Sequence, residues 1–135
     1  MFTEAELDYL ASQRLGRLAT AKPDGTLQVS PVGFRVNPET GTIDIAGRGM
    51  AGSKKFRNVA DNGRVAFVVD DVASLSPWTV RCLEIRGRGE AIATPVDSAY
   101  GGSSPAGFDG AIIRIHPARI ISFGIGSESG SRDAR

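Results

Sequence analysis

Short runs in which apolar and polar residues alternate, separated by turn signals, occupy most of this chain. RLGRLATA (14–21) leads into a Pro-Asp-Gly turn at 23–25, and TLQVSPVGFRV (26–36) follows. The second run has the alternation of a strand, with Gln28, Ser30, Val32 and Phe34 on one face and Val29, Pro31, Gly33 and Arg35 on the other. A second turn, NPETG, leads to TIDIAG. Two hairpins in about thirty residues predict an antiparallel meander.

The residues before the first strand have a different pattern. Thr3 and Glu6 have the spacing of a capping box, in which each residue satisfies a free backbone N–H of the other. This predicts a short helix over residues 4–12. Its inner face is expected to consist of Leu7, Leu10 and Ala11.

Two longer apolar runs follow the meander. RVAFVVDD (64–71) is apolar on both faces, which predicts a central strand buried on both sides. VASLSPW (72–78) is expected to be a loop, and TVRCLEIRGRGEAIA (79–93) the next strand. One face of that strand carries Leu83, Ile85, Gly87, Gly89 and Ala91. Its glycines indicate strong curvature or the close approach of another backbone.

The last third of the chain begins with residues 95–110, which are rich in Gly, Ser and Pro and are expected to form an excursion. AIIRIHPARIISFGI (111–125) predicts one or two closing strands with a break at Pro117. Residues 126–135 are small and polar and are expected to be disordered. About six strands with few helices predict one small β-barrel domain over residues 1–125.

Composition limits the possible functions. The chain has 135 residues, 41% hydrophobic and 23% charged, with a net charge of only +1, which disfavours a general nucleic-acid binder. A single cysteine, an acidic N-terminal segment and the lack of an apolar run near ~20 residues predict a cytoplasmic protein outside the membrane.

One stretch stands out against this nearly neutral background. AGRGMAGSKKFRNV (46–59) contains Arg48, Lys54, Lys55 and Arg57, and no acid occurs from residue 45 to residue 60. Ser53 is a natural N-cap for a helix over 54–62, which would place both lysines in its first turn. Cations are disfavoured there by about 0.3–1 kcal/mol each, because the helix dipole is positive at that end. A bound phosphate would remove the conflict.

Two other interpretations of this stretch were weighed. Lysines near a helix start are common on solvated faces, because their long stems carry the charge into water. The spacing of Gly47 and Gly52 also has a superficial likeness to a nucleotide-binding P-loop. That motif requires Lys directly after the second glycine, whereas Ser53 follows here, and it requires a parallel βαβ unit. The nucleoside-triphosphate interpretation is therefore rejected.

Few other residues carry recognisable chemistry. His116 and Cys82 have no partners at metal-ligand or catalytic spacing, so neither a metal site nor a catalytic residue is predicted. Trp78, beside Pro77, could cover a planar ligand or anchor a loop. A phosphate site without acid–base or nucleophilic groups is typical of a protein whose bound cofactor supplies the chemistry.

The ordered segments resemble a known group of proteins. RLGRLATAKPDGTLQVSPVGFRV, GSKKFRNVADNGRVAFVVDD, LEIRGRGEAI and IRIHPARI together are similar to the pyridoxamine 5'-phosphate oxidase-like superfamily. Within it, they are most similar to the oxidoreductases that depend on the deazaflavin coenzyme F-420. The resemblance implies a mainly β fold, a six-stranded antiparallel split β-barrel with a few short helices. It also implies a homodimer with the cofactor in a cleft between protomers.

The resemblance carries over a set of cofactor-binding positions. Backbone contacts to the cofactor's ring match Ser30, Pro31, Val32 and Gly33, and phosphate contacts match Lys55, with Arg48, Ser53 and Lys54 beside it. Arg57 lies in the same motif, and Trp78 matches a loop that closes over the site.

The expected activity is hydride transfer between bound F-420 and an unsaturated small-molecule substrate. An alternative is an FMN-dependent oxidoreductase of the same fold, because FMN shares the ring and ribityl-phosphate plan. A further alternative is a non-catalytic protein that binds flavin, F-420 or haem. Nucleic-acid binding is disfavoured because Phe56 is the only aromatic among the cations.

Overall fold

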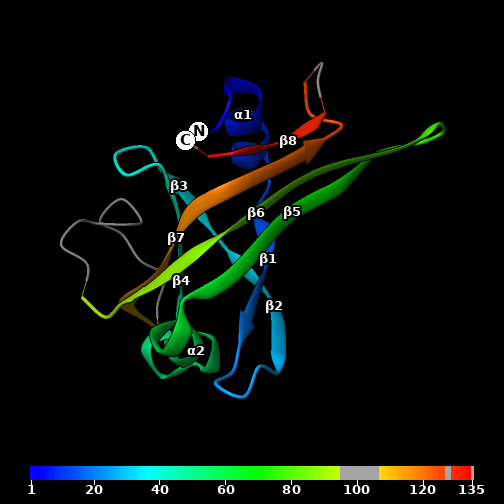
Figure 1. The fold of residues 1–135 in the computed structure, drawn as a ribbon. Coiled ribbons are helices and arrows are strands. Elements are labelled where there is room, and N and C mark those ends of the chain that lie inside the picture. Colours follow the sequence, from blue (N-terminus) through cyan, green and yellow to red (C-terminus); the bar gives the residue numbers. More distant parts are fainter. Residues whose placement is uncertain (95–106, 127–128, 135) are drawn as a thin grey trace.

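The computed structural model describes residues 1–94, 107–126 and 129–134. One curled antiparallel sheet of eight strands forms the body of the molecule (Figure 1), which confirms the mainly β, split-barrel class. The elements are α1 (Glu4–Ser12), β1 (Leu15–Ala21), β2 (Leu27–Gly33), β3 (Arg35–Asn37), β4 (Thr42–Arg48), a 3₁₀ turn η1 (Met50–Gly52), α2 (Lys54–Asn62), β5 (Arg64–Leu75), β6 (Trp78–Ile92), β7 (Phe108–Phe123) and β8 (Gly130–Asp133). Six strands were predicted; β3 and β8 are the additions.

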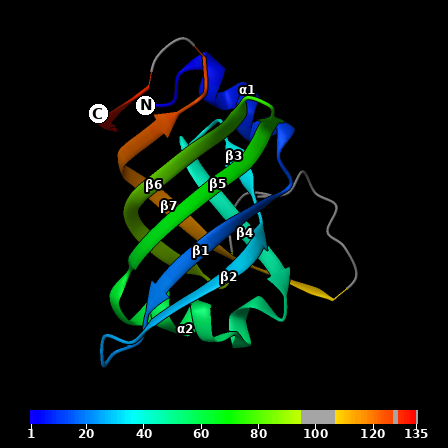
Figure 2. The same cartoon turned by 90° about the vertical axis from the view of Figure 1, so that its right-hand side faces the viewer.

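The order of the strands explains why the sheet curls. It runs β2-β1-β5-β6-β7-β4-β3, with β8 added beside β7. The two strands at the ends of this order, β2 and β3, are separated in the chain only by Phe34. The sheet therefore has to bend back on itself, and β2 also contacts β4 (Figure 2). The ring of Phe34 packs edge-on against Phe67, with 5.3 Å between centroids.

The interior of this curled sheet is the hydrophobic core, and a helix lies at each end (Figure 2). The capping box that predicted α1 is confirmed, because Thr3 N–H donates to Glu6 and Glu6 N–H donates to Thr3 Oγ1. The predicted inner face was partly wrong. Leu10 is buried, but Leu7 and Ala11 are exposed, and Glu6 and Tyr9 take their places. The short helix rests on the barrel end by one side only.

The predicted loop over residues 72–78 was wrong. β5 and β6 continue as a hairpin to the pair Leu75–Trp78, leaving only Ser76 and Pro77 in the turn (Figure 1). Pairing with the neighbouring strand overrides the turn-like composition of this stretch. The prediction that β5 is buried on both sides was wrong. Val65, Phe67 and Val69 are buried, but on the opposite face Ala66 and Val68 are only half-buried and Arg64 and Asp70 are exposed.

Gly87 confirms the prediction of a close backbone approach. A Cβ atom there would overlap the His116 carbonyl oxygen, where the β6–β7 register shifts. This irregularity replaces the predicted break at Pro117, and β7 runs through it as one strand. A bulge at this point bends the pair and so contributes to the curl of the sheet.

The C-terminal segment also differs from expectation. Residues 130–133, predicted to be disordered, form β8 against β7, and Ala134 N–H donates to the Ala118 carbonyl. Residues 127, 128 and 135 lie outside the described part of the chain. So does most of the predicted excursion over 95–110, while residues 108–110 belong to β7.

A buried ionic cluster ties β3, β4 and β7 together. The side chain of Asp44 has no exposed surface, and both its oxygens accept hydrogen bonds from Arg114 at 3.0 Å. Asn37 and Thr42 donate to the same carboxylate. Such a cluster is stabilising only while every member has its partner, because an unpaired buried charge is costly.

We expect Gly87→Ala to destabilise the fold by about 1–3 kcal/mol, because the added methyl group must push the β7 backbone away at the bulge. Chemical denaturation of the purified variant measures this. Gly130→Ala is the matched control, since a Cβ there meets nothing within 4 Å. Equal stability of the two variants would contradict the role given to Gly87.

Candidate functional site

A cleft of about 230 Å³ lies between β2, the end of β4 and the first turn of α2. It is lined by Pro31, Val32, Gly33, Ala46, Gly47, Arg48, Lys55 and Phe108. The structure thus brings together both halves of the predicted site, the low-profile segment of β2 and two of the four clustered cations.

The β2 wall presents backbone rather than bulky side chains. Pro31 and Gly33 face outward and are exposed, whereas Val32 turns into the core. A Cβ at Gly33 would meet nothing within 4 Å, so the space in front of it is open. Ser30, predicted with these residues, shares the inner face with Val32 and does not line the cleft.

The opposite wall carries the positive charge. Arg48 ends β4 and is exposed, and Lys55 lies half-buried in the first turn of α2. Between them Gly49 adopts a left-handed conformation with φ of 53°, which reverses the chain. In the part of the chain that the structure describes, neither cation has a carboxylate partner.

The helix that carries Lys55 begins and ends as predicted. Ser53 Oγ accepts from Phe56 N–H at 3.2 Å, and Gly63 ends the helix with φ of 67°. The same hydroxyl donates to the Met50 carbonyl at 2.7 Å, so Ser53 is occupied as a cap. Other N–H groups of the first turn lack partners within the helix, as at any helix start, and this leaves a positive end beside Lys55.

The rest of α2 decides which cations reach the cleft. Lys54 and Arg57 are exposed and do not line it. Phe56 and Val59 are buried as predicted; Ala60, predicted with them, is exposed, and Asn58 is buried instead. Asn58 donates to Thr20 Oγ1 at 3.1 Å and to Gln28 Oε1 at 3.3 Å. These bonds fix α2 against β1 and β2, and therefore fix Lys55 relative to Pro31.

Some residues of this region were missed by the sequence analysis. Asp109 accepts hydrogen bonds from the N–H groups of Ala51 and Ala111, which hold the η1 turn, and the Ala51 bond is the main cause of its lowered pKa. Phe108 forms part of the lining. The one sequence signal for Phe108 was an aromatic residue inside a glycine-rich stretch, and Asp109 had none.

Trp78 was predicted to lie over the site, but it does not line the cleft. It stands at the tip of the β5–β6 hairpin and is 67% exposed. The hairpin tip and α2 lie toward different ends of the molecule (Figure 1).

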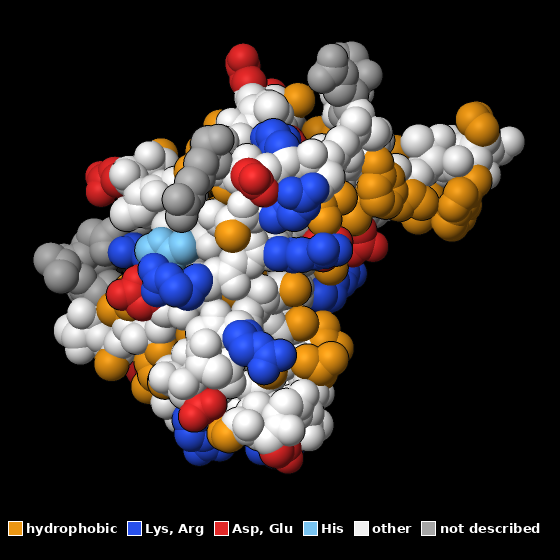
Figure 3. Space-filling model, in the orientation of Figure 1, with side chains coloured by type: hydrophobic (Ala, Val, Ile, Leu, Met, Phe, Trp, Pro, Cys, Tyr) orange, Lys and Arg blue, Asp and Glu red, His pale blue; other side chains and the backbone are white. Residues whose placement is uncertain are grey.

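A second, apolar groove of about 240 Å³ runs over the outer face of the sheet. Its lining consists of Arg17, Ala19, Val29, Ala66, Phe67, Val68 and Glu84. Val29 is 67% exposed and faces the same side of β2 as Pro31 and Gly33, because side chains alternate along the strand. The groove and the cationic cleft therefore share the outer face of β2. Hydrophobic side chains line the right-hand edge of the molecule and the hairpin in Figure 3.

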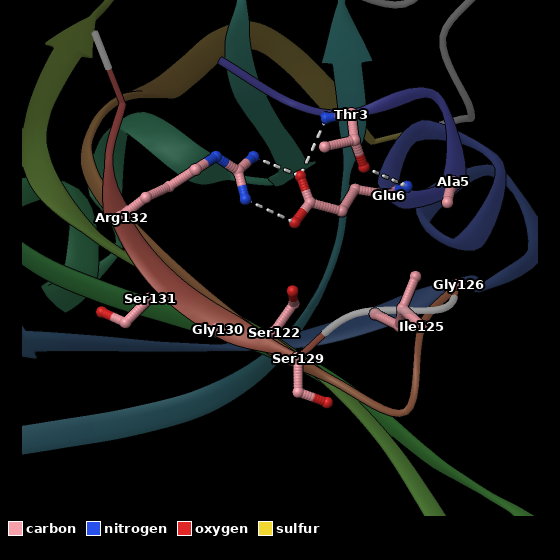
Figure 4. Close-up of a pocket in the computed structure, with 10 residues that line it drawn as sticks. All are labelled: Thr3, Ala5, Glu6, Ser122, Ile125, Gly126, Ser129, Gly130, Ser131 and Arg132. Atoms are coloured by element: carbon pink, nitrogen blue, oxygen red, sulfur yellow. Dashed lines mark hydrogen bonds and ion pairs between the residues drawn. The ribbon is translucent and has the colours of Figure 1, made fainter.

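A pocket of about 320 Å³ lies at the α1 end of the barrel (Figure 4). Its charged groups satisfy one another: both Arg132 amino groups donate to the buried Glu6 carboxylate. Burial raises the pKa of Glu6, but the hydrogen bonds from Arg132 and Thr3 and the charge of Arg132 outweigh it and leave the pKa below its usual value. This pair joins β8 to α1 and is structural.

The cleft offers position and charge rather than reactive groups. Its described lining contains no His, Cys, Asp or Glu, and no cluster of possible metal ligands occurs among the residues that were described. Such a site suits a bound group that brings its own chemistry.

Comparison with known proteins identifies the family. The family model for pyridoxamine 5'-phosphate oxidase matches residues 2–123, so the chain belongs to this family. The chain is 48% identical over 126 residues to a 5a,11a-dehydrotetracycline/5a,11a-dehydrooxytetracycline reductase of Streptomyces rimosus, covering 92% of this chain and 84% of the relative. The homologue supports an oxidoreductase.

Solved structures agree on the fold. An FAD-binding protein of Mycobacterium smegmatis superposes with a TM-score of 0.66 at 22% identity, covering 90% of this chain and 94% of that one. A haem-binding protein of the same organism gives a TM-score of 0.71 at 16% identity, covering 98% of this chain and 59% of that one.

Among the described residues, no helix is long and apolar enough to span a membrane.

We expect Glu6→Gln to lower the stability by about 1.5–3 kcal/mol at neutral pH, through weakened hydrogen bonds with Arg132. In the folded protein the pKa of Glu6 lies below its usual value of 4.5. The stabilisation is therefore fully present above pH 4.5 and is lost as the pH falls through the pKa that Glu6 has in the folded state. Urea unfolding from pH 7 to pH 3 should therefore show the gap to wild type closing. The exposed neighbour Glu4→Gln is the control, and a gap independent of pH would refute the assignment.

Proposed function

We propose that this chain is a homodimeric reductase that binds coenzyme F-420 and transfers a hydride to an unsaturated small-molecule substrate. The observation that carries the proposal is the cleft itself, where Arg48 and Lys55, which have no carboxylate partner among the described residues, face an open stretch of β2 backbone. The dehydrotetracycline reductase at 48% identity supports the reaction class.

The residues of the cleft fit a flat cofactor with a phosphate at one end. Lys55, Arg48 and the N-terminal end of α2 would hold the phosphate, since charge-assisted hydrogen bonds to an anion are strong and the helix dipole favours it. The backbone of residues 31–33 would support the ring, because neither Pro31 nor Gly33 raises a bulky side chain over it. The cofactor, when bound, would supply the hydride.

The proposed substrate is a compound with a conjugated carbon–carbon double bond. The relative's name supports this, because it describes reduction of a dehydro compound at positions 5a and 11a. The lining of the cleft provides no protein acid or base among its described residues. The second hydrogen, a proton, would come from solvent or from a nearby side chain outside this lining, and the role of the chain would be to position the two reactants.

The proposed homodimer would bury the apolar groove. Val29 and the half-buried Ala66 and Val68 are apolar side chains on the outer face of the sheet that one protomer leaves uncovered. Because this face continues along β2 to Pro31 and Gly33, a partner seated on the groove would also wall the cleft. This supports a cofactor bound between protomers, and it would let the exposed Trp78 of one hairpin reach the cleft of the other.

FMN is the second candidate cofactor, because the same cleft would accept its ring and phosphate. Yellow protein with flavin absorbance after purification from a host without F-420 would favour FMN. Tight binding without turnover would favour a non-catalytic carrier of flavin, F-420 or haem. In each case we propose a cytoplasmic protein with small-molecule ligands rather than nucleic acid.

We expect Lys55→Ala to weaken binding of F-420 about 10- to 100-fold, because a charge-assisted hydrogen bond contributes roughly 1.5–3 kcal/mol. Parallel fluorescence titrations with F-420 and FMN measure this loss and identify the preferred cofactor. Lys22→Ala, which removes the same side chain in the β1–β2 turn, is the control. Unchanged affinity in Lys55→Ala would disprove the phosphate assignment, and failure of wild type to bind either molecule would disprove the proposed function.

We expect Val29→Glu to shift the protein from dimer to monomer, because a charge in an apolar interface must be desolvated without a partner. Light scattering after size-exclusion chromatography gives the mass directly. Leu7→Glu, on the exposed side of α1, should leave the dimer intact. A wild-type monomer at micromolar concentration would rule out the homodimer without touching the cofactor assignment.

A further inference from the structure

The β5–β6 hairpin extends beyond the rest of the sheet. β1 pairs with β5 only along residues 65–68, and β7 pairs with β6 only from Cys82 onward. Among the described residues, 72–80 therefore form ladder pairs only with one another. We call residues 72–80 the arm; Figure 1 shows it projecting from the barrel. Pairing with β1 and β7 therefore does not fix the angle between the arm and the barrel.

Three side chains meet where the arm begins. Asp71 and Arg81 are opposite each other across β5 and β6, and Arg81 Nε donates to Asp71 Oδ1 at 2.9 Å. Tyr9 comes from α1, and its hydroxyl donates to the same oxygen at 3.0 Å. The Arg81 guanidinium also lies 5.0 Å from the centre of the Tyr9 ring. Through Tyr9, helix α1 thus contacts both strands of the hairpin at its base.

The cluster of Tyr9, Asp71 and Arg81 is partly buried and is therefore more rigid than a contact between exposed side chains. Tyr9 is only 5% exposed, although its helix lies at the barrel end. Burial and the Asp71 carboxylate raise the pKa of Tyr9, while the hydrogen bond from Arg81 lowers the pKa of Asp71. At neutral pH a neutral phenol therefore donates to an ionised carboxylate, which makes the bond charge-assisted and stronger than a neutral one.

The tip of the arm carries two large exposed apolar side chains, so the angle of the arm determines where they lie. Leu75 and Trp78 are 79% and 67% exposed, and they pair with each other at the end of the hairpin. At about 3.3 Å per residue, the four steps from residue 71 to residue 75 put the tip roughly 13 Å from the joint. A tilt of about 10° at the base would move the tip by roughly 2 Å, enough to make or break a packing contact.

We propose that Tyr9, Asp71 and Arg81 are positioning residues that set the angle at which the arm leaves the barrel. Resting on the proposed function, this angle decides where Leu75 and Trp78 of one protomer meet the cleft of the second copy. Helix α1 of one protomer therefore holds the arm of the same protomer, and through that arm it affects the cleft of the second copy.

Trp78 is the only tryptophan of the chain, so its own fluorescence reports the motion of the arm without any ligand. Tyr9→Phe keeps the buried ring and removes only the hydroxyl. We expect its loss to shift the balance between held and free arm about tenfold or more, because a hydrogen bond to a charged group is lost. Time-resolved anisotropy of Trp78 should then gain a fast nanosecond component, and Asp71→Asn should do the same.

The controls separate this idea from general destabilisation and from the proposed function. Asp133→Asn removes an exposed ion pair with Arg119, far along β7, and should leave the Trp78 anisotropy as in wild type. All variants are also measured in the Val29→Glu background, so that a second copy cannot hold the arm. If Tyr9→Phe lowers the melting temperature but leaves the Trp78 decay unchanged, the positioning role is refuted. If the protein binds no cofactor, the proposed function is wrong. The Trp78 anisotropy would still test the positioning role of Tyr9, Asp71 and Arg81.

Discussion

The whole architecture depends on one connection. β2 and β3 stand at opposite ends of the hydrogen-bonded strand order, yet only Phe34 separates them in the chain. The sheet can satisfy both conditions only by curling until its edges meet. Phe34 makes that closure favourable, because its ring packs inside against Phe67. The same closure carries the outward backbone of residues 31–33 to the end of β4, and the cationic cleft is formed where they meet.

Closure divides the sheet into two unequal faces. The inner face is filled by the core, and the glycine at position 87 lets β6 and β7 approach closely where the sheet bends. The buried Asp44–Arg114 pair joins β4 to β7 on the opposite face, because both residues alternate with core isoleucines. The outer face of β1, β2 and β5 keeps apolar side chains that one protomer leaves uncovered, such as Val29. A monomeric protein gains little from such a face, since exposed apolar patches favour association. The geometry that creates the cleft therefore also supplies the surface through which a partner could complete it.

Local chemistry was the part that the sequence could predict. The caps at Thr3 and Ser53 and the stop at Gly63 depend on neighbours within a few residues, and they were found. β8 was missed because a long-range contact holds it: Arg132 of β8 reaches Glu6 from the other end of the chain. The arm was missed for a different reason, because its Ser-Pro turn signal was extended over 72–78 although the strands pair as far as Leu75 and Trp78. The family resemblance assigned Lys55 and Pro31 to one site, but their relative position depends on long-range bonds of Asn58, which join α2 to β1 and β2.

The charges of the cleft are best understood against the rest of the surface. Most arginines of the barrel have carboxylate partners, as Arg17, Arg81 and Arg119 do. Exposed Arg64 and Arg88 have none among the described residues, but water solvates them at little cost. Lys55 differs because it is half-buried beside the positive end of α2, where the helix dipole opposes its charge. An anion placed there would offset this unfavourable interaction. This electrostatic arrangement supports the proposal that the cleft holds the charged end of a ligand, with the neutral β2 wall beside the rest of it.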